Sequence, residues 1–84
     1  FDGNELVLNF SSSAAGGIKV EIRDEDGVAI PGYATTDCEA VFGDAINRPV
    51  HWKSKGSDVS ELRGKSVQLH IQLRDADLFA FQFR

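Results

Sequence analysis

The sequence predicts an all-β domain, an antiparallel β-sandwich of about six or seven strands with one short helical turn. Three observations predict it. Apolar residues recur at every second position, turn-forming residues separate these stretches at short intervals, and only one short stretch has helical features. The 84 residues suffice for one small hydrophobic core, so we expect a single domain over residues 1–84.

Two strands are expected in the N-terminal part of the chain. Apolar residues occupy alternate positions in two stretches, Leu6, Leu8 and Phe10, then Ile18, Val20 and Ile22. This period of two is typical of strands with one buried face. The Ser-, Ala- and Gly-rich segment between them, residues 11–17, is expected to be a loop.

The C-terminal part repeats the pattern in two further stretches, Val67, Leu69, Ile71 and Leu73, then Phe79, Phe81 and Phe83. Between the halves of the chain, Val50 and Trp52 share a face, which predicts another strand that begins at Pro49. Because these rings follow the apolar phase of their strands, we expect Trp52 and the three phenylalanines to pack in the core.

Turns and one helical turn complete the prediction. Asp24–Gly27 and Pro31–Gly32 have the composition of tight turns. A helical turn is expected near Asp58–Leu62, with Asp58 as its cap and Glu61 completing a capping-box-like pair. Gly64 is expected to end it.

Charge and cysteine content exclude several function classes. A net charge of −4 and the lack of a basic cluster argue against nucleic-acid partners and anionic membrane surfaces. No apolar run approaches the roughly 18 residues of a membrane-spanning helix. The single cysteine, Cys38, cannot form an intrachain disulfide and is expected to be a buried thiol. Since the chain contains no methionine, we expect it to be part of something longer.

A weak internal repeat allows two interpretations. Residues 18–26 and 69–77 share their apolar phase, and each ends in Arg-Asp-x-Asp. The favoured interpretation is that these aspartates bond to their own backbone in turns, and that no cofactor is needed. The alternative is a calcium site, with carboxylates from two strand ends that meet: Asp24, Asp26, Asp75 and Asp77.

No catalytic constellation is present in the sequence, so we expect no catalytic residue. Glu39 is the one acid with apolar neighbours in sequence, and a loop or edge position suits it better than a catalytic role. Cys38 and His51 could in principle pair as nucleophile and base, but no glycine-rich elbow accompanies either. His51 and His70 occupy polar strand positions and are expected at the surface. A small stand-alone hydrolase or a calcium-dependent binding domain remains the alternative function.

Sugar binding uses exposed aromatic rings that stack on pyranose faces. Tyr33 and Phe42 lie in the least regular segment and are the expected exposed rings. The candidate carbohydrate site therefore combines three ring platforms with two polar residues: Tyr33, Phe42, Trp52, Asp44 and Arg48.

The order of these small signals resembles a known family. The pattern comprises Leu6-x-Leu8-Asn9-Phe10-Ser11-x-Ser13-Ala14-x-Gly16, Ile18-x-Val20-Glu21-Ile22-x-Asp24-x-Asp26-Gly27-x-x-Ile30-Pro31-Gly32, Asp37-Cys38, Gly43-Asp44, Trp52, Asp58-Val59-Ser60-x-Leu62-x-Gly64-Lys65 and Asp75-Ala76-Asp77-Leu78-x-x-Phe81. Over nearly the whole chain it is similar to the C-terminal β-sandwich module of secreted glycoside hydrolases of the invertase-like (fructosidase) superfamily. In those enzymes the module follows a catalytic β-propeller.

The resemblance implies a concanavalin-like or jelly-roll-like sandwich that is an accessory to glycoside hydrolysis, structural or weakly carbohydrate-binding, and without catalytic residues. It also implies an extracellular or periplasmic location. The family's module has strands upstream of the counterpart of Phe1, so this chain is expected to be the C-terminal part of a larger module with an open sheet edge. Such an edge favours a homodimer. The alternative is a compact monomer in which residues 34–48 cover the gap.

Overall fold

Two long antiparallel strands, β1 (Leu6–Arg23) and β5 (Gln68–Phe83), form the frame of the molecule. The computed structural model describes residues 3–84. The other elements in this part are short: β2 (Cys38–Glu39), β3 (Asp44–Pro49), β4 (His51–Trp52) and the 3-10 turns η1 (Thr35–Asp37) and η2 (Ser60–Leu62). All strand pairs are antiparallel, which confirms the all-β prediction. Within the described residues, no helix is long and apolar enough to cross a membrane.

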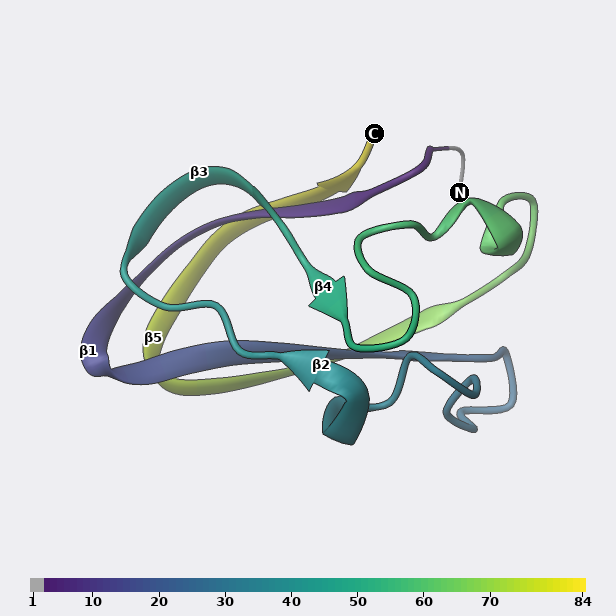
Figure 1. The fold of residues 1–84 in the computed structure, drawn as a ribbon, viewed down its shortest axis with the longest axis horizontal. Helices are drawn as coiled ribbons and strands as arrows, with labels where there is room; N and C mark the ends of the chain where they lie inside the picture. Colours follow the sequence, from purple (N-terminus) through teal and green to yellow (C-terminus); the bar gives the residue numbers. More distant parts are fainter. Residues whose placement is uncertain (1–2) are drawn as a thin grey trace.

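Both long strands bend sharply at their middle, so that each runs through two facing layers (Figure 1). We call residues 6–12 and 17–23 the first and second arms of β1. The bend in β5 coincides with Asp75, whose φ of 49° lies in the left-handed region. At the bend the strands are so close that a Cβ on Gly16 would lie 2.7 Å from the carbonyl oxygen of Asp75 and closer still to that of Arg74. Gly16 is therefore required there.

The bend corrects the predicted loop at residues 11–17. Small residues in this segment let β1 turn without leaving the sheet, and the pairing with β5 resumes at Gly17 opposite Arg74 after a register shift. The same holds for β5, whose two predicted strands are one. The structure therefore has five strands in its described part, where the sequence predicts six or seven.

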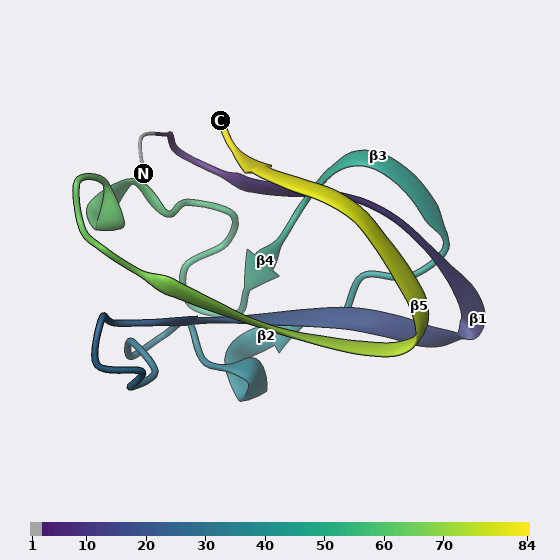
Figure 2. The same cartoon turned by 180° about the vertical axis from the view of Figure 1, so that it is seen from behind.

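The strand order is β3-β1-β5 in the larger sheet, and β2 and β4 form a separate pair. β3 lies along the first arm of β1, where Pro49 is opposite Val7. Pro49 is thus the last residue of β3 and not the first residue of the strand that contains Trp52. β5 is the other edge of this sheet and lies on the near side in Figure 2.

The second arm of β1 has no long strand on the side away from β5, and shorter segments complete its hydrogen bonds. Ile18 exchanges backbone hydrogen bonds of 2.8 and 3.0 Å with Val41. Ile22 donates to the carbonyl of Tyr33 and accepts from the amide of Ile30, both at 2.9 Å. Val20 lies midway between Ile18 and Ile22. Its backbone groups are bonded by the side chains of Cys38 in β2 and Trp52 in β4 instead.

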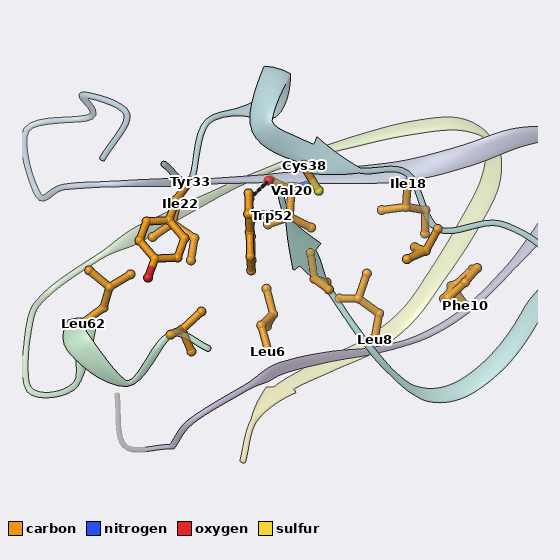
Figure 3. Packing of buried hydrophobic residues seen from close by; sticks show 13 residues of the cluster. Leu6, Leu8, Phe10, Ile18, Val20, Ile22, Tyr33, Cys38, Trp52 and Leu62 are labelled. Atoms are coloured by element: carbon orange, nitrogen blue, oxygen red, sulfur yellow. Dashed lines mark hydrogen bonds between the residues drawn. The ribbon is translucent and has the colours of Figure 1, made fainter. Parts of the chain in front are cut away.

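The core lies between the two arms of β1 (Figure 3). The alternating residues of both arms are buried as predicted, and Tyr33, Val50, Trp52, Val59 and Leu62 fill the space between them. The rings of Tyr33 and Trp52 meet edge to face, with centroids 5.4 Å apart and planes at 70°.

The predicted turns are confirmed. Oδ1 of Asp24 accepts from the amides of Asp26 at 2.9 Å and Val28 at 3.0 Å, and Gly27 has a φ of 83°. The predicted capping of the helical turn by Asp58 is wrong, because η2 begins at Ser60 and its N-cap residue is Val59. Oδ1 of Asp58 still accepts from the amide of Ser60, at 2.8 Å.

The predicted capping role of Glu61 is wrong. Its carboxylate instead accepts from the hydroxyl of Tyr33 at 3.0 Å and forms an ion pair with Lys55 at 3.1 Å. The reason is that the buried Tyr33 ring brings its hydroxyl to this end of the core.

Candidate functional site

The five residues predicted to bind carbohydrate do not converge on one site. Tyr33 and Trp52 are fully buried, so neither ring offers a face to a ligand. The expected exposure of Tyr33 is wrong, because its ring packs on Trp52 and its hydroxyl lies 3.1 Å from the carbonyl oxygen of Asp58. Phe42 is 58% exposed, as expected.

The two predicted polar residues lie at opposite ends of β3. Asp44 begins the strand opposite Ser11, and Arg48 lies near its end opposite Leu8. Arg48 lines a different surface hollow, together with Glu39 and His51. Only Asp44 belongs to the hollow described next.

A register shift in the pairing of β1 with β5 turns Phe79 outward. Phe10 is opposite Leu78 and Asn9 is opposite Ala80, so Phe79 has no partner in β1 and forms a bulge. Its ring is 70% exposed. The prediction that Phe79 packs in the core is therefore wrong. The even alternation of three phenylalanines gives no sign of this bulge.

Phe79 lines a surface hollow of about 660 Å³, which we call the Phe79 hollow. It is formed where β3, β1 and β5 lie side by side, and its other main lining residues are Asn9, Ser11, Asp44 and Ile46. Ile46 is among the most exposed apolar residues, at 84%. Of the residues that line this hollow, sequence reasoning identified only Asp44. It missed Ile46 and Phe79 because their exposure depends on strand register.

Hydrogen bonds hold the polar side chains of the hollow in place. The hydroxyl of Ser11 donates to Oδ1 of Asp44 at 2.6 Å. Oδ1 of Asn9 accepts from the backbone amide of Asn47 at 3.0 Å. The side-chain Nδ2 of Asn9 has no hydrogen-bond partner among residues 3–84 and can donate to a ligand. The hollow thus presents an apolar ring beside a carboxylate and an amide donor.

The four aspartates considered for calcium do not come together. The repeat segments that carry them pair antiparallel, with Arg23 opposite Gln68 and Gly17 opposite Arg74. Antiparallel pairing puts the two Arg-Asp-x-Asp ends at opposite ends of the second arm. Asp24 and Asp26 therefore follow one end of this paired segment, and Asp75 and Asp77 follow the other end. In residues 3–84 no group of three or more histidine, cysteine or acidic side chains is placed to hold a metal.

The acids with a shifted pKa are all shifted toward the charged form. The guanidinium of Arg23 and the backbone amide of Thr35 lower the pKa of Glu21. Hydrogen bonds from Ser60 lower the pKa of Asp58. Lys55 and the hydroxyl of Tyr33 lower the pKa of Glu61.

Cys38 and His51 do not form a nucleophile–base pair. In the β2–β4 pair, Cys38 is opposite Trp52 and His51 is opposite Glu39, so the thiol and the imidazole lie on different faces. The thiol is buried and free, as predicted, and burial raises its pKa. His51 is exposed and Glu39 is an exposed edge residue, as expected.

Comparisons with protein-family models, with curated proteins and with solved structures gave no match to this chain.

Proposed function

We propose that the chain is a non-catalytic accessory module with a β-sandwich, jelly-roll-like architecture, and that it binds carbohydrate weakly through the Phe79 hollow. One observation carries the proposal: an outward-facing aromatic ring beside fixed polar side chains on a sheet surface. A non-catalytic accessory role is also what the sequence resemblance to the C-terminal module of invertase-like glycoside hydrolases implies.

The chemistry of the hollow matches that of a sugar. A pyranose or furanose ring has C–H groups that pack on an aromatic face, and hydroxyl groups that both donate and accept hydrogen bonds. Phe79 supplies the face, Asp44 supplies acceptor oxygens and Asn9 supplies a donor.

The architecture supports an accessory sandwich module. The bent strands β1 and β5 each cross both layers, and the apolar faces of the layers enclose one core. Strands that pass from one layer into the other at a bend or bulge form the corners of orthogonally packed β-sandwiches.

The electrostatics support a non-catalytic role. Glycoside hydrolysis needs a carboxylic acid whose pKa is raised by an apolar environment. Glu21, Asp58 and Glu61 have lowered pKa values, and no charged side chain in residues 3–84 is buried. A small stand-alone hydrolase is the alternative, and it would have to work with acids that are exposed or only partly buried.

A glycan array tests the proposal, with fructo-oligosaccharides among the glycans. We expect weak binding to a restricted set of oligosaccharides by the wild-type chain and its loss in Phe79→Ala. Phe42→Ala is the matched control, because it removes an exposed phenylalanine outside the hollow. Retained binding in Phe79→Ala, or no binding by the wild-type chain to any glycan, would count against the proposal.

A further inference from the structure

The edge of β5 that faces away from β1 is open. β5 is the last strand of its sheet, and along residues 69–82 no other described strand lies beside this edge (Figure 2). Such an edge presents a row of backbone donors and acceptors to solvent. Natural proteins cover or disrupt long open edges, and this one is long.

A groove of about 640 Å³ accompanies the open edge, and we call it the flank groove. Residues 64–67 line one part of it and apolar side chains of β5 line the rest. Both arms of β5 contribute to it: Leu69 and Ile71 from one layer, Phe81 and Phe83 from the other. Phe81 is 50% exposed, although it lies opposite the buried Leu8 in the sheet. The inner faces of the two layers are thus uncovered at this flank. Phe81 points toward the core side of the sheet as predicted, but it is not buried there.

From this geometry we propose that a second copy of the chain covers the flank, with the two β5 strands paired antiparallel about their midpoints. The midpoint of β5 (Gln68–Phe83) falls between Asp75 and Ala76, at the bend. The two arms of β5 are therefore equal in length. A two-fold axis through the bend places residues 68–75 of each copy beside residues 76–83 of the other. Both layers then continue across the interface.

The charges near the midpoint are complementary in this register. Arg74 falls opposite Asp77 of the second copy, and symmetry makes this pair twice. Both side chains are exposed, and neither forms an ion pair within residues 3–84. Both lie on the outer face, because Arg74 is opposite Gly17 and Asp77 is opposite Ser11 in β1.

The apolar side chains also match. Leu73 falls opposite Leu78 of the second copy. When Phe79 is left out of the pairing, as it is on the β1 side, Ile71 falls opposite Phe81 of the second copy and Leu69 opposite its Phe83. Each of these residues is on the inner face, so the pairing extends the apolar interior and closes the flank groove. A partner strand with polar residues at these positions would leave that interior open.

A charge-swap series tests this register with the full chain and no sugar present. Arg74→Asp places two aspartates opposite each other, and Asp77→Arg places two arginines opposite each other. The double variant Arg74→Asp/Asp77→Arg restores opposite charges. Both substitutions are at exposed positions, so circular dichroism should show an unchanged fold in all three variants.

Sedimentation equilibrium across a concentration range gives the readout. We expect a wild-type dimer, a dimer dissociation constant raised about tenfold or more in each single variant, and recovery in the double variant. A wild-type chain that stays at 9.2 kDa at the highest concentration overturns the proposal. A dimer that neither single variant weakens overturns the β5 register. Neither result depends on whether the Phe79 hollow binds sugar.

Discussion

The indole Nε1 of Trp52 donates a hydrogen bond to the carbonyl oxygen of Val20 at 3.0 Å (Figure 3). The amide of the same Val20 donates to Sγ of Cys38 at 3.3 Å. Two buried side chains thus complete the hydrogen bonds of the second arm of β1 where no strand lies beside it. This explains how a tryptophan with a polar group can sit at the centre of the core.

Replacing Trp52 by Phe should therefore destabilise the fold strongly. Trp52→Phe leaves the buried carbonyl of Val20 without its donor and creates a cavity, for a loss of about 2–5 kcal/mol in the free energy of unfolding. Urea denaturation measures this loss. Phe42→Leu, at an exposed ring, should change it by less than about 0.5 kcal/mol. Equal stabilities of the two variants would show that the Trp52–Val20 bond does not hold the arm.

Gly16→Ala tests the bend of the two long strands. The added Cβ would meet the carbonyl oxygens of Arg74 and Asp75, which belong to the backbone of β5 and cannot move aside alone. We expect a loss of roughly 1–3 kcal/mol or more, as for other overpacked sites. In Gly17→Ala the nearest atom is the carbonyl oxygen of Val41 at 3.2 Å, so a smaller loss is expected. If thermal denaturation ranks the variants the other way, the geometry of the bend is wrong.

The pH dependence of stability should follow the acids with lowered pKa values. For Glu21 and Glu61 the folded pKa lies below the ordinary value of 4.5, so the charged form is favoured by folding. This contribution is complete above about pH 4.5 and is lost as the pH falls through the folded pKa. We expect the urea midpoint to drop on acidification from about pH 5 to pH 3, and to drop less in Glu21→Gln. If the urea midpoint of Glu21→Gln fell as steeply with acidification as that of the wild-type chain, the contacts of Glu21 with Arg23 and Thr35 would be excluded as a source of the pH dependence.

Cys38 should react slowly with thiol reagents in the native state. Its burial raises the thiol pKa, and the thiolate is the reactive form. With Ellman's reagent at pH 8, we expect the native reaction to be many times slower than the reaction in concentrated urea. Similar rates in both conditions would mean that the β2–β4 pair opens readily.

The sequence was sufficient to predict which face of β1 is buried, because its apolar residues alternate and one face must meet the core. It was not sufficient to predict that β1 and β5 each continue through the bend, since Ser, Ala and Gly between two strands are equally typical of a loop. Phe79 points outward because one residue bulges in the pairing, and Tyr33 is buried because Trp52 lies beside it. Both outcomes depend on contacts between segments far apart in the sequence.

Only part of the candidate site can be predicted from the sequence, because the rest also depends on contacts between distant segments. Asp44 was identified from its place in the irregular segment, and the structure puts it in the Phe79 hollow. The aromatic platform could not be identified, because the local pattern around Phe79 is that of a core strand.

Nuclear magnetic resonance tests most directly whether the Phe79 hollow binds carbohydrate. An ¹⁵N-labelled chain is titrated with the oligosaccharide that gives the strongest array signal. We predict saturable amide shifts at Asn9, Ser11, Asp44 and Phe79, which disappear in Phe79→Ala and persist in Phe42→Ala. Shifts confined to other residues, or shifts that survive in Phe79→Ala, would contradict the proposed function.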